Sequence, residues 1–565
     1  MQTMSNLQKF NAAMNRFRAK TRLSSIRDME MPQVQTEQKA IVYLSIGQLN
    51  QRAKVFHQIS DKSYEHALEK VSSKALKWIN KYQPNLAFLK VDLVHQIEET
   101  TVPTLQKNIQ AFKKNYFRRG LSFDADFSLS FLEQEVVGNA FVREATNGII
   151  GIDEVNIRHY LKTNRYKIFN FNLSAYNNKS IYLFDTIGYF FDFTEQRQWK
   201  TLQQGELTNG VRQTSNLKKE IEQIVKKATH FLAKEIQPSG QFNYGYFSAF
   251  AKPIGTYNIL RHASSVYAML EGYEVLKTKD ILIKAQQSLT YLMTAIVFKD
   301  VNTAYVVDKE NNNEIKLGSN ATAILAMTKY AEVSGDKSYN DTAEKLANGI
   351  IAMRNDETGH YNHVLHYPDF TIKDKFRIIY YEGEAVFALL RLYQLDGNKK
   401  WLDEVVSYFE IFIAEEYWKE HDHWLSYAVN ELTDYLSEDK YYQFGLKNCA
   451  DKLSFIYHRE TTFATFLELT MAAYKMIDKI KQADKAYLLN DFDEELLRKT
   501  IDKRAEFQRV GFMYPEVAMY FKQPALVLNG FFIRHQSLRV RIDDVEHNLS
   551  GYIQYLTYRL GESMT

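Results

Sequence analysis

The sequence predicts a mostly helical protein, an (α/α)6 toroid or barrel of helical hairpins preceded by a smaller α+β domain. A twelve-residue pattern recurs between Arg261 and Tyr558. In its clear copies, position five is a small or branched apolar residue, position nine is Leu or Met, and position twelve is Tyr. A short polar turn and a second helical segment follow each copy. The stretches from Pro253 to Pro368 and from Pro368 to Pro515 contain no other proline, which suits packed helices.

The repeated pattern predicts six inner helices. Steps of four and then three residues place positions five, nine and twelve on one stripe of a helix. Hairpins that cannot each bury an apolar face alone must stack on their neighbours, and six of them close when helix six packs on helix one. Four copies are clear and two, anchored on their Tyr, are fainter: residues 262–273, 319–330, 382–393 and 424–435, then 463–474 and 547–558.

The residues before the barrel have a different pattern. Residues 38–200 predict an α+β domain of unknown role, because β-branched and aromatic runs alternate with amphipathic helices. This stretch has no nucleotide-binding glycine loop. A polar linker at 199–210 separates it from the barrel, residues 211–565. The expected elements are strands at 40–47, 88–94 and 180–193, and helices at 63–82 and 104–117.

Residues 1–37 are expected to be a basic N-terminal arm. No acidic residue precedes Asp28, whereas basic side chains are frequent before it. Such a segment can be an organelle transit peptide, an anionic-surface contact or a solvated tail, and the solvated tail is favoured. The basic residues are Lys9, Arg16, Arg18, Lys20, Arg22 and Arg27.

The composition argues against several classes of partner and site. A net charge of +3 without a basic stripe does not favour a nucleic-acid partner. The single Cys449 excludes an internal disulfide framework and a cysteine-rich zinc site. No apolar run is long enough for a transmembrane segment, and the start lacks the apolar core of a secretory signal. The sequence therefore predicts a cytoplasmic protein without a cofactor, and leaves its oligomeric state open.

Polar and ionisable residues recur where each inner helix is expected to begin. In a barrel of hairpins these starts surround one end of the ring, which we call the mouth. Each residue alone has a structural explanation, as a helix cap, an ion pair or a core histidine. Their recurrence at the same position of successive hairpins nevertheless favours a functional site. The candidates are Asn258, Arg261, His262, Asn320, Tyr381, Glu382, Glu384, Asp422, His423, Trp424, Arg541, Asp543, Asp544 and His547.

A carboxylate pair favours glycoside hydrolysis. One carboxylic acid protonates the leaving oxygen while a second carboxylate activates water or attacks carbon. Glu382 and either Asp543 or Asp544 would face each other across the ring, at roughly 6 to 10 Å in an inverting enzyme. Glu382 and Glu384 are two residues apart on one helix, so both cannot point into the ring. The sugar would be held by Asn258, Arg261, Asn320, Tyr381, Glu384, Asp422, His423, Trp424 and Arg541.

In its repeat and its expected architecture, the stretch from about 216 to 560 resembles the six-hairpin glycosidase-like superfamily and the sugar epimerases that share its toroid. The resemblance implies a carbohydrate-active enzyme with a carbohydrate or glycan substrate. The N-acylglucosamine 2-epimerase group implies acid/base chemistry instead of hydrolysis. Its candidate pair here is His262 and His547, at position one of hairpins one and six. A toroid that binds a glycan or a protein without catalysis is the third alternative.

No metal site is predicted. His421, Asp422 and His423 are the nearest approach to a ligand set. Residues that follow one another in this way on a loop or helix are a poor set on their own.

Overall fold

The computed structural model describes the chain except for residues 1–4, 23–28, 166–169, 196–197, 206 and 562–565. The chain forms two compact units. The sheet unit comprises Met1–Ser215, Tyr246–Lys252 and Val510–Val540. The barrel unit comprises Asn216–Gly245, Pro253–Arg509 and Arg541–Thr565.

The sheet unit is built on an antiparallel sheet with the strand order β4-β3-β5-β10-β6-β7, to which β11 adds by pairing with β10. The long central strands are rich in β-branched and aromatic residues, which suit a pleated, buried surface. The predicted strands at 40–47, 88–94 and 180–193 correspond to β3, β5 and β10. The strands are β3 (Ala40–Gly47), β4 (Lys54–Ser60), β5 (Phe88–Thr101), β6 (Gly120–Ser122), β7 (Ser130–Phe131), β10 (Ser180–Asp192) and β11 (Lys200–Thr201).

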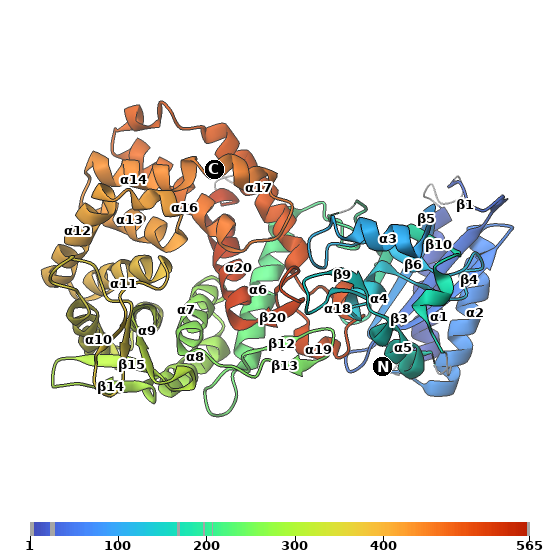
Figure 1. Ribbon diagram of the computed structural model, residues 1–565, viewed down its shortest axis with the longest axis horizontal. Helices are drawn as coiled ribbons and strands as arrows, with labels where there is room; N and C mark the ends of the chain where they lie inside the picture. Colours follow the sequence, from blue (N-terminus) through green and yellow to red (C-terminus); the bar gives the residue numbers. More distant parts are fainter. Residues whose placement is uncertain (1–4, 23–28, 166–169, 196–197, 206, 562–565) are drawn as a thin grey trace. The chain divides into compact units, whose positions relative to one another are not determined.

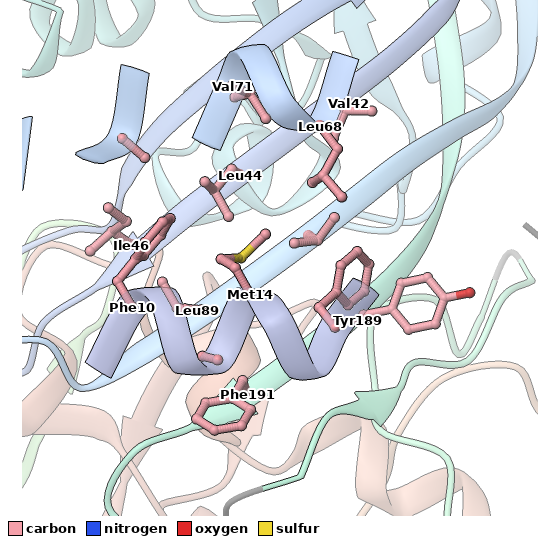
Figure 2. Packing of buried hydrophobic residues seen from close by; sticks show 14 of the residues in the cluster. Phe10, Met14, Val42, Leu44, Ile46, Leu68, Val71, Leu89, Tyr189 and Phe191 are labelled. Atoms are coloured by element: carbon pink, nitrogen blue, oxygen red, sulfur yellow. The ribbon is translucent and has the colours of Figure 1, made fainter. Parts of the chain in front are cut away.

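Helices α1 (Asn6–Arg22) and α2 (Tyr64–Tyr82) contribute to one hydrophobic core with the sheet. In Figure 2, Phe10 and Met14 of α1 lie against Leu44 and Ile46 of β3. Phe17 continues the apolar stripe of α1 and is 1% exposed. The part of the predicted arm that forms α1 is therefore not a solvated tail, and residues 1–4 and 23–28 lie outside the described residues. The prediction relied on the basic residues and overlooked the apolar residues Phe10, Met14 and Phe17. Their i, i+4, i+7 spacing forms the stripe that packs on the sheet.

A second core in the same unit contains residues of α3 (Val102–Ile109), α5 (Glu154–Asn164) and the strand pair β8–β9. The helix predicted at 104–117 ends at Ile109, and Asn115 then adopts a left-handed φ of 64°. The remaining elements of this stretch are β1 (Gln33–Val34), β2 (Glu37–Gln38), α4 (Glu133–Gly138), β8 (Val142–Glu144) and β9 (Ile150–Ile152).

Two segments that the sequence assigned elsewhere belong to the sheet unit. The expected linker begins with Trp199, which is 6% exposed, and continues into β11. Residues 510–540, expected in the barrel, pack on the sheet because Met519 and Tyr520 enter its core. Arg212 also donates to both carboxylate oxygens of Glu516 at 2.7 and 2.6 Å. This segment holds α18 (Pro515–Ala518), α19 (Pro524–Val527) and β19 (Phe532–Ile533).

The barrel unit contains the six predicted inner helices, including both fainter copies. Each inner helix packs on the next, and α20 packs on α7, which closes the ring (Figure 1). Helix α9 buries every residue from Leu317 to Ala331, as expected for a helix that is apolar on nearly all sides. The (α/α)6 fold class is therefore confirmed. The inner helices are α7 (Ile259–Leu276), α9 (Leu317–Ser334), α11 (Tyr380–Asp396), α13 (His423–Tyr435), α16 (Thr465–Gln482) and α20 (Ile542–Gln554).

An outer helix packs against each inner helix, and the two ends of the ring differ. Short turns follow the first four inner helices, and residues 483–493 connect the fifth to its outer helix, whereas the connections that lead into α9 and α11 carry the antiparallel sheet β14-β15-β16-β17-β18. The elaborated end is the mouth. The outer helices are α6 (Leu217–Glu235), α8 (Lys279–Met293), α10 (Asn340–Ala352), α12 (Lys399–Ala414), α14 (Asp439–Ala450) and α17 (Glu494–Gln508).

The remaining elements are short. Strands β12, β13 and β20 lie where the chain passes from one unit to the other. In the part of the chain that the structure describes, no helix is both long and apolar enough to span a membrane. The short elements are β12 (Gly245–Phe247), β13 (Lys252–Pro253), β14 (Ile296–Phe298), β15 (Ala304–Asp308), β16 (Glu314–Lys316), β17 (Val364–His366), β18 (Ile372–Asp374), α15 (Leu453–His458) and β20 (Arg539–Arg541).

Candidate active site

Two histidines and three glutamates from the mouth ends of four inner helices form what we call the histidine cluster: His423, His547, Glu384, Glu468 and Glu546. His423 is the first residue of α13, and Glu468 lies in the first turn of α16. The two imidazole rings are 5.2 Å apart, centroid to centroid, and nearly perpendicular at 81°. Closure of the ring thus brings together residues that are more than a hundred positions apart in the sequence.

His547 carries a positive charge at neutral pH. Its Nδ1 donates to Glu468 Oε2 at 3.1 Å, which leaves Nε2 as the other site for a proton. Burial opposes the charge, but the carboxylates of Glu546, Glu468 and Asp543 outweigh burial and raise the pKa of His547 to about 10. The side chain is 24% exposed, so the imidazolium can exchange its proton with solvent or with a ligand.

His423 has one nitrogen without a partner. Its Nε2 is buried and accepts or donates no hydrogen bond among the described residues, and Glu468 Oε2 lies 3.9 Å away. Its backbone position is fixed, because the side chain of Asp422 caps α13 by accepting from the Trp424 and Leu425 amides at 3.1 Å each. His423 is therefore held at a helix start with its Nε2 available to a ligand.

Glu384 and Glu546 are carboxyl groups that retain protons more readily than usual. Burial and the nearby charges of Asp422 and Glu546 raise the pKa of Glu384 well above its ordinary value, and its Oε2 has no hydrogen-bond partner among the described residues. Burial raises the pKa of Glu546 to about 7, although the positive charge of His547 and a hydrogen bond from Ser264 act in the opposite direction. A proton donor is therefore present beside the histidines.

Glycine makes room for Glu384. A Cβ built on Gly318 of α9 would lie 2.1 Å from Glu384 Oε2 and 2.6 Å from the ring of Tyr381. Contacts this short do not occur between real side chains, so the carboxyl group fills the space that the missing side chain leaves.

Asp543 is neutralised by two arginines. Arg261 Nε lies 2.9 Å from Asp543 Oδ2, and Arg541 binds the same carboxylate with two nitrogens. Arg541 also lies 3.5 Å from Asp544, and Arg261 donates to the Tyr244 hydroxyl at 2.8 Å. This network joins α7 to α20. A carboxylate held by two guanidinium groups is poorly suited to donate a proton.

Glu382 does not face Asp543 or Asp544 as predicted. It accepts from His363 Nε2 at 3.1 Å and lines a separate cavity of about 260 Å³ beside Tyr361 and Tyr417. His363 Nδ1 accepts the backbone amide of Arg377, which fixes the tautomer that donates to Glu382. Glu384, two residues later on α11, occupies the place expected of Glu382.

His262 does not pair with His547 as predicted. Its Nδ1 bonds the Tyr257 hydroxyl at 2.7 Å, and its Nε2 bonds the Ser288 carbonyl on α8 at 3.0 Å. Burial lowers the pKa of His262 to about 4, although the bond to Ser288 opposes the decrease. His262 is thus a neutral core histidine, and His423 stands beside His547 instead.

The other predicted ligands of the sugar divide into two groups. Asn258 caps α7, and Asn320 accepts the Val306 amide at 2.8 Å, so both secure the backbone. Trp424 lies 6.5 Å from the His547 ring and Tyr381 lies 5.5 Å from the His363 ring, centroid to centroid. Trp424 and Tyr381 are therefore close enough to the mouth residues to contact a ligand there.

Sequence reasoning missed Glu468 and Glu546. The fifth hairpin supplied none of the predicted residues, although its inner helix, which begins at Thr465, carries Glu468 in its first turn. An acidic residue in the first turn of an otherwise apolar inner helix was the available signal for Glu468. Glu546 directly precedes a predicted site histidine.

The cluster also has the donor types of a metal site. One atom each of His423, Glu468 and His547 lies within 4.8 Å of the others, and zinc takes such nitrogen and oxygen ligands. Within the cluster, Glu468 Oε2 is already bonded to His547 Nδ1 at 3.1 Å. We assign no metal to the cluster.

No family model and no curated protein sequence matches the chain. Several solved structures resemble it. A cellobiose 2-epimerase from Bacillus thermoamylovorans B4167 is 12% identical and covers 60% of this chain and 99% of its own, with a TM-score of 0.45. A D-mannose isomerase is 11% identical over 61% and 100%, with a TM-score of 0.47. An unsaturated glucuronyl hydrolase specific for heparin is 11% identical over 61% and 98%, with a TM-score of 0.44. Likeness at this level says nothing about the activity of this chain.

Proposed function

We propose that the barrel unit is a sugar isomerase or epimerase in which His423 and His547 transfer a proton at a carbon next to a carbonyl group. The observation that carries the proposal is the pair of imidazole rings 5.2 Å apart, one charged and one with an unpartnered nitrogen. A base and an acid positioned on one substrate carbon are what such a reaction requires.

The proposed reaction proceeds through an enediol. His423 Nε2 removes the proton from the carbon beside the carbonyl, and the C–H electron pair forms the carbon–carbon double bond. The carbonyl π electrons move to oxygen, which takes the proton of the His547 imidazolium. For the isomer, protonated His423 returns its proton to the former carbonyl carbon, and neutral His547 takes the proton of the neighbouring hydroxyl group, whose O–H electron pair forms the new carbonyl. For the epimer, the enediol presents its opposite face to His423, which returns the proton to the first carbon while His547 takes back the proton from oxygen and the original carbonyl re-forms. Glu468 holds the His547 ring through Nδ1 and stabilises its charge.

Residues around the cluster would bind the substrate. Arg261 is 36% exposed and presents a guanidinium beside Asp543, suited to sugar hydroxyl groups. Trp424 and Tyr381 would present aromatic faces to the C–H groups of the sugar ring. The proposed substrate is accordingly a small carbohydrate with a reducing end.

Deuterium exchange tests the proposal. The protein is incubated in D2O with D-glucose, D-mannose or cellobiose, and deuterium at the carbon beside the carbonyl is followed by NMR. The variants His423→Asn and His547→Asn should lose exchange by about 100-fold or more. His360→Gln is the matched control, because His360 pairs with Glu415 outside the cluster. Absence of exchange with every sugar, or full activity in both variants, would refute the proposal.

Glycoside hydrolysis, the chemistry that the sequence placed first, is the second candidate. The observation that favours it is Glu384, a buried carboxyl group with a raised pKa and an unpartnered oxygen. Glu384 would be the general acid in place of Glu382, with Glu546 or Asp422 as the second carboxylate. Release of reducing ends from oligosaccharides, abolished in Glu384→Gln and retained in His423→Asn, would establish hydrolysis and exclude the isomerase.

A further inference from the structure

The barrel has a large cavity at the end opposite the mouth. Its volume is about 650 Å³, within the range of small-molecule sites, and the second halves of all six inner helices line it. We call it the distal cavity. The carboxylates of Glu274, Glu332 and Asp434 are 47%, 38% and 56% exposed, so they form its rim. Gln554, which is 7% exposed, lies at its floor beside Tyr427.

Most charges in the distal cavity are already paired. Lys329 lies 2.6 Å from Glu274, and Arg391 lies 2.6 Å from Glu332 and 3.3 Å from Glu431. A third pair joins Lys479 to Asp434 at 2.6 Å. A ligand with a large net charge of either sign would therefore disturb more pairs than it forms.

Three polar side chains that line the distal cavity are available to a ligand. Glu431 Oε1 and Gln554 Oε1 are buried and accept no hydrogen bond from the residues that the structure describes. Lys475 is half-buried, and its ammonium group lies 4.7 Å from the centre of the Tyr558 ring. Burial lowers the pKa of Lys475. An unsatisfied buried polar group costs about 1–3 kcal/mol, so a ligand that donates to both of these oxygens would be held firmly.

We propose that the distal cavity binds a small polyhydroxylated molecule, a mono- or disaccharide, at a site separate from the histidine cluster. A hydroxyl group both donates and accepts, so one molecule can donate to Glu431 and Gln554 and accept from Lys475. The rings of Tyr267 and Phe387 supply apolar surface for the C–H faces of a sugar. The proposal does not depend on the reaction assigned to the mouth.

A chain of hydrogen bonds joins the floor of the distal cavity to the histidine cluster. Gln554 Nε2 donates to the Tyr427 hydroxyl at 2.7 Å, and that hydroxyl donates to Glu468 Oε1 at 3.0 Å. Glu468 Oε2 in turn accepts from His547 Nδ1 at 3.1 Å. A ligand that bonds Gln554 thus acts on the first member of a chain that ends at His547.

Binding of D-glucose, D-mannose and cellobiose to the full chain, measured by calorimetry and saturation-transfer NMR, tests the site. Lys475→Met and Glu431→Gln should each weaken binding by about tenfold or more, as expected for loss of a hydrogen bond to a charged group. Lys481→Met is the matched control, because Lys481 lies on the same helix but pairs with Glu494 at the surface. His423→Asn should leave binding at the distal cavity unchanged.

The outcomes separate the distal cavity from the mouth. Weaker binding in Lys475→Met, with normal binding in Lys481→Met and His423→Asn, supports the site whether or not the protein exchanges deuterium. Binding that only His423→Asn removes, or no binding of any of the three sugars, refutes it and leaves a cavity filled by water. If Lys475→Met does not fold, Tyr558→Leu serves instead, since Tyr558 is 41% exposed at the rim and can be changed without opening the core.

Discussion

Replacing Glu468 by glutamine should lower the pKa of His547 and thereby change the acid of the proposed reaction. Burial opposes the charge of His547, the carboxylate of Glu546 favours it, and Glu468 favours it both by its charge and by its hydrogen bond. Asp543 adds a smaller attraction. The amide of glutamine keeps the size of the side chain and removes the charge, so the substitution isolates the electrostatic contribution.

The expected size of the effect follows from the raised pKa. The increase from 6.5 to about 10 is about 3.5 pKa units, or about 5 kcal/mol at about 1.4 kcal/mol per unit. An opposite charge at this distance contributes roughly 1 to 3 units. In Glu468→Gln the pKa of His547 should therefore lie between about 7 and about 9.

NMR titration of the histidine ring protons measures this directly, with the His547 signal assigned by its loss in His547→Asn. Glu494→Gln is the control, because Glu494 pairs with Lys481 and Arg498 at the surface of the barrel. A wild-type His547 that titrates near 6.5, or a pKa that Glu468→Gln leaves unchanged, would refute the assignment of His547 as the charged partner.

The same shift predicts how stability depends on pH. The folded pKa of His547 is above its unfolded value, so its contribution is complete below about pH 6.5 and is lost as pH rises towards about 10. Urea unfolding should show a smaller loss of stability across this window in Glu468→Gln than in the wild type. An equal loss in both proteins would show that His547 is not the group responsible.

Two further substitutions test the packing of each unit. Gly318→Ala places a Cβ 2.1 Å from Glu384 Oε2, so we expect a loss of about 1–3 kcal/mol in urea unfolding and weaker deuterium exchange; an unchanged protein would mean that Glu384 lies elsewhere. Arg212→Met leaves the fully buried carboxylate of Glu516 without its ion pair and should destabilise the sheet unit by about 3–5 kcal/mol. The double variant Arg212→Met/Glu516→Gln should recover part of this loss, and failure to recover would point to packing.

The ring could be predicted from the sequence because its helices follow one periodic rule. The stripe of apolar residues that ends in Tyr marks each inner helix, and closure follows from the need to bury that stripe on both sides. The strands at the mouth, β14 to β18, were not expected, because they are short segments within connections that carry no repeat. Residues 510–540 were misassigned for a related reason: proximity in sequence does not reveal that Met519 and Tyr520 fill the core of another unit.

Three residues of the histidine cluster, Glu384, His423 and His547, were among the predicted candidates, whereas the predicted partners His262 and Glu382 point away from it. Position one of the repeat carries His262 and Glu382, which turn to Ser288 and His363. Position three carries Ser264 and Glu384, which contact or approach the cluster. Two residues along a helix correspond to a rotation of about 200° about the helix axis. Choosing position one in place of position three therefore selects side chains that point out of the ring in place of those that point into it.

The sixth copy of the repeat shows that a residue's position in the repeat does not determine whether its side chain reaches the site. The direction in which the helix presents that side chain does. Aligned on its Tyr, that copy has Gly551 at position five and Tyr555 at position nine, so it breaks the apolar rule that fixes the other copies. A Cβ built on Gly551 would lie 3.2 Å from Leu467 Cβ of α16, so glycine lets the two helices approach closely here. His547 bonds Glu468 on α16, whereas His262, at the same nominal position, bonds Ser288 on α8. A carboxylate on a neighbouring inner helix, and not a place in the repeat, is what converts one of the two histidines into a charged group at the mouth of the barrel.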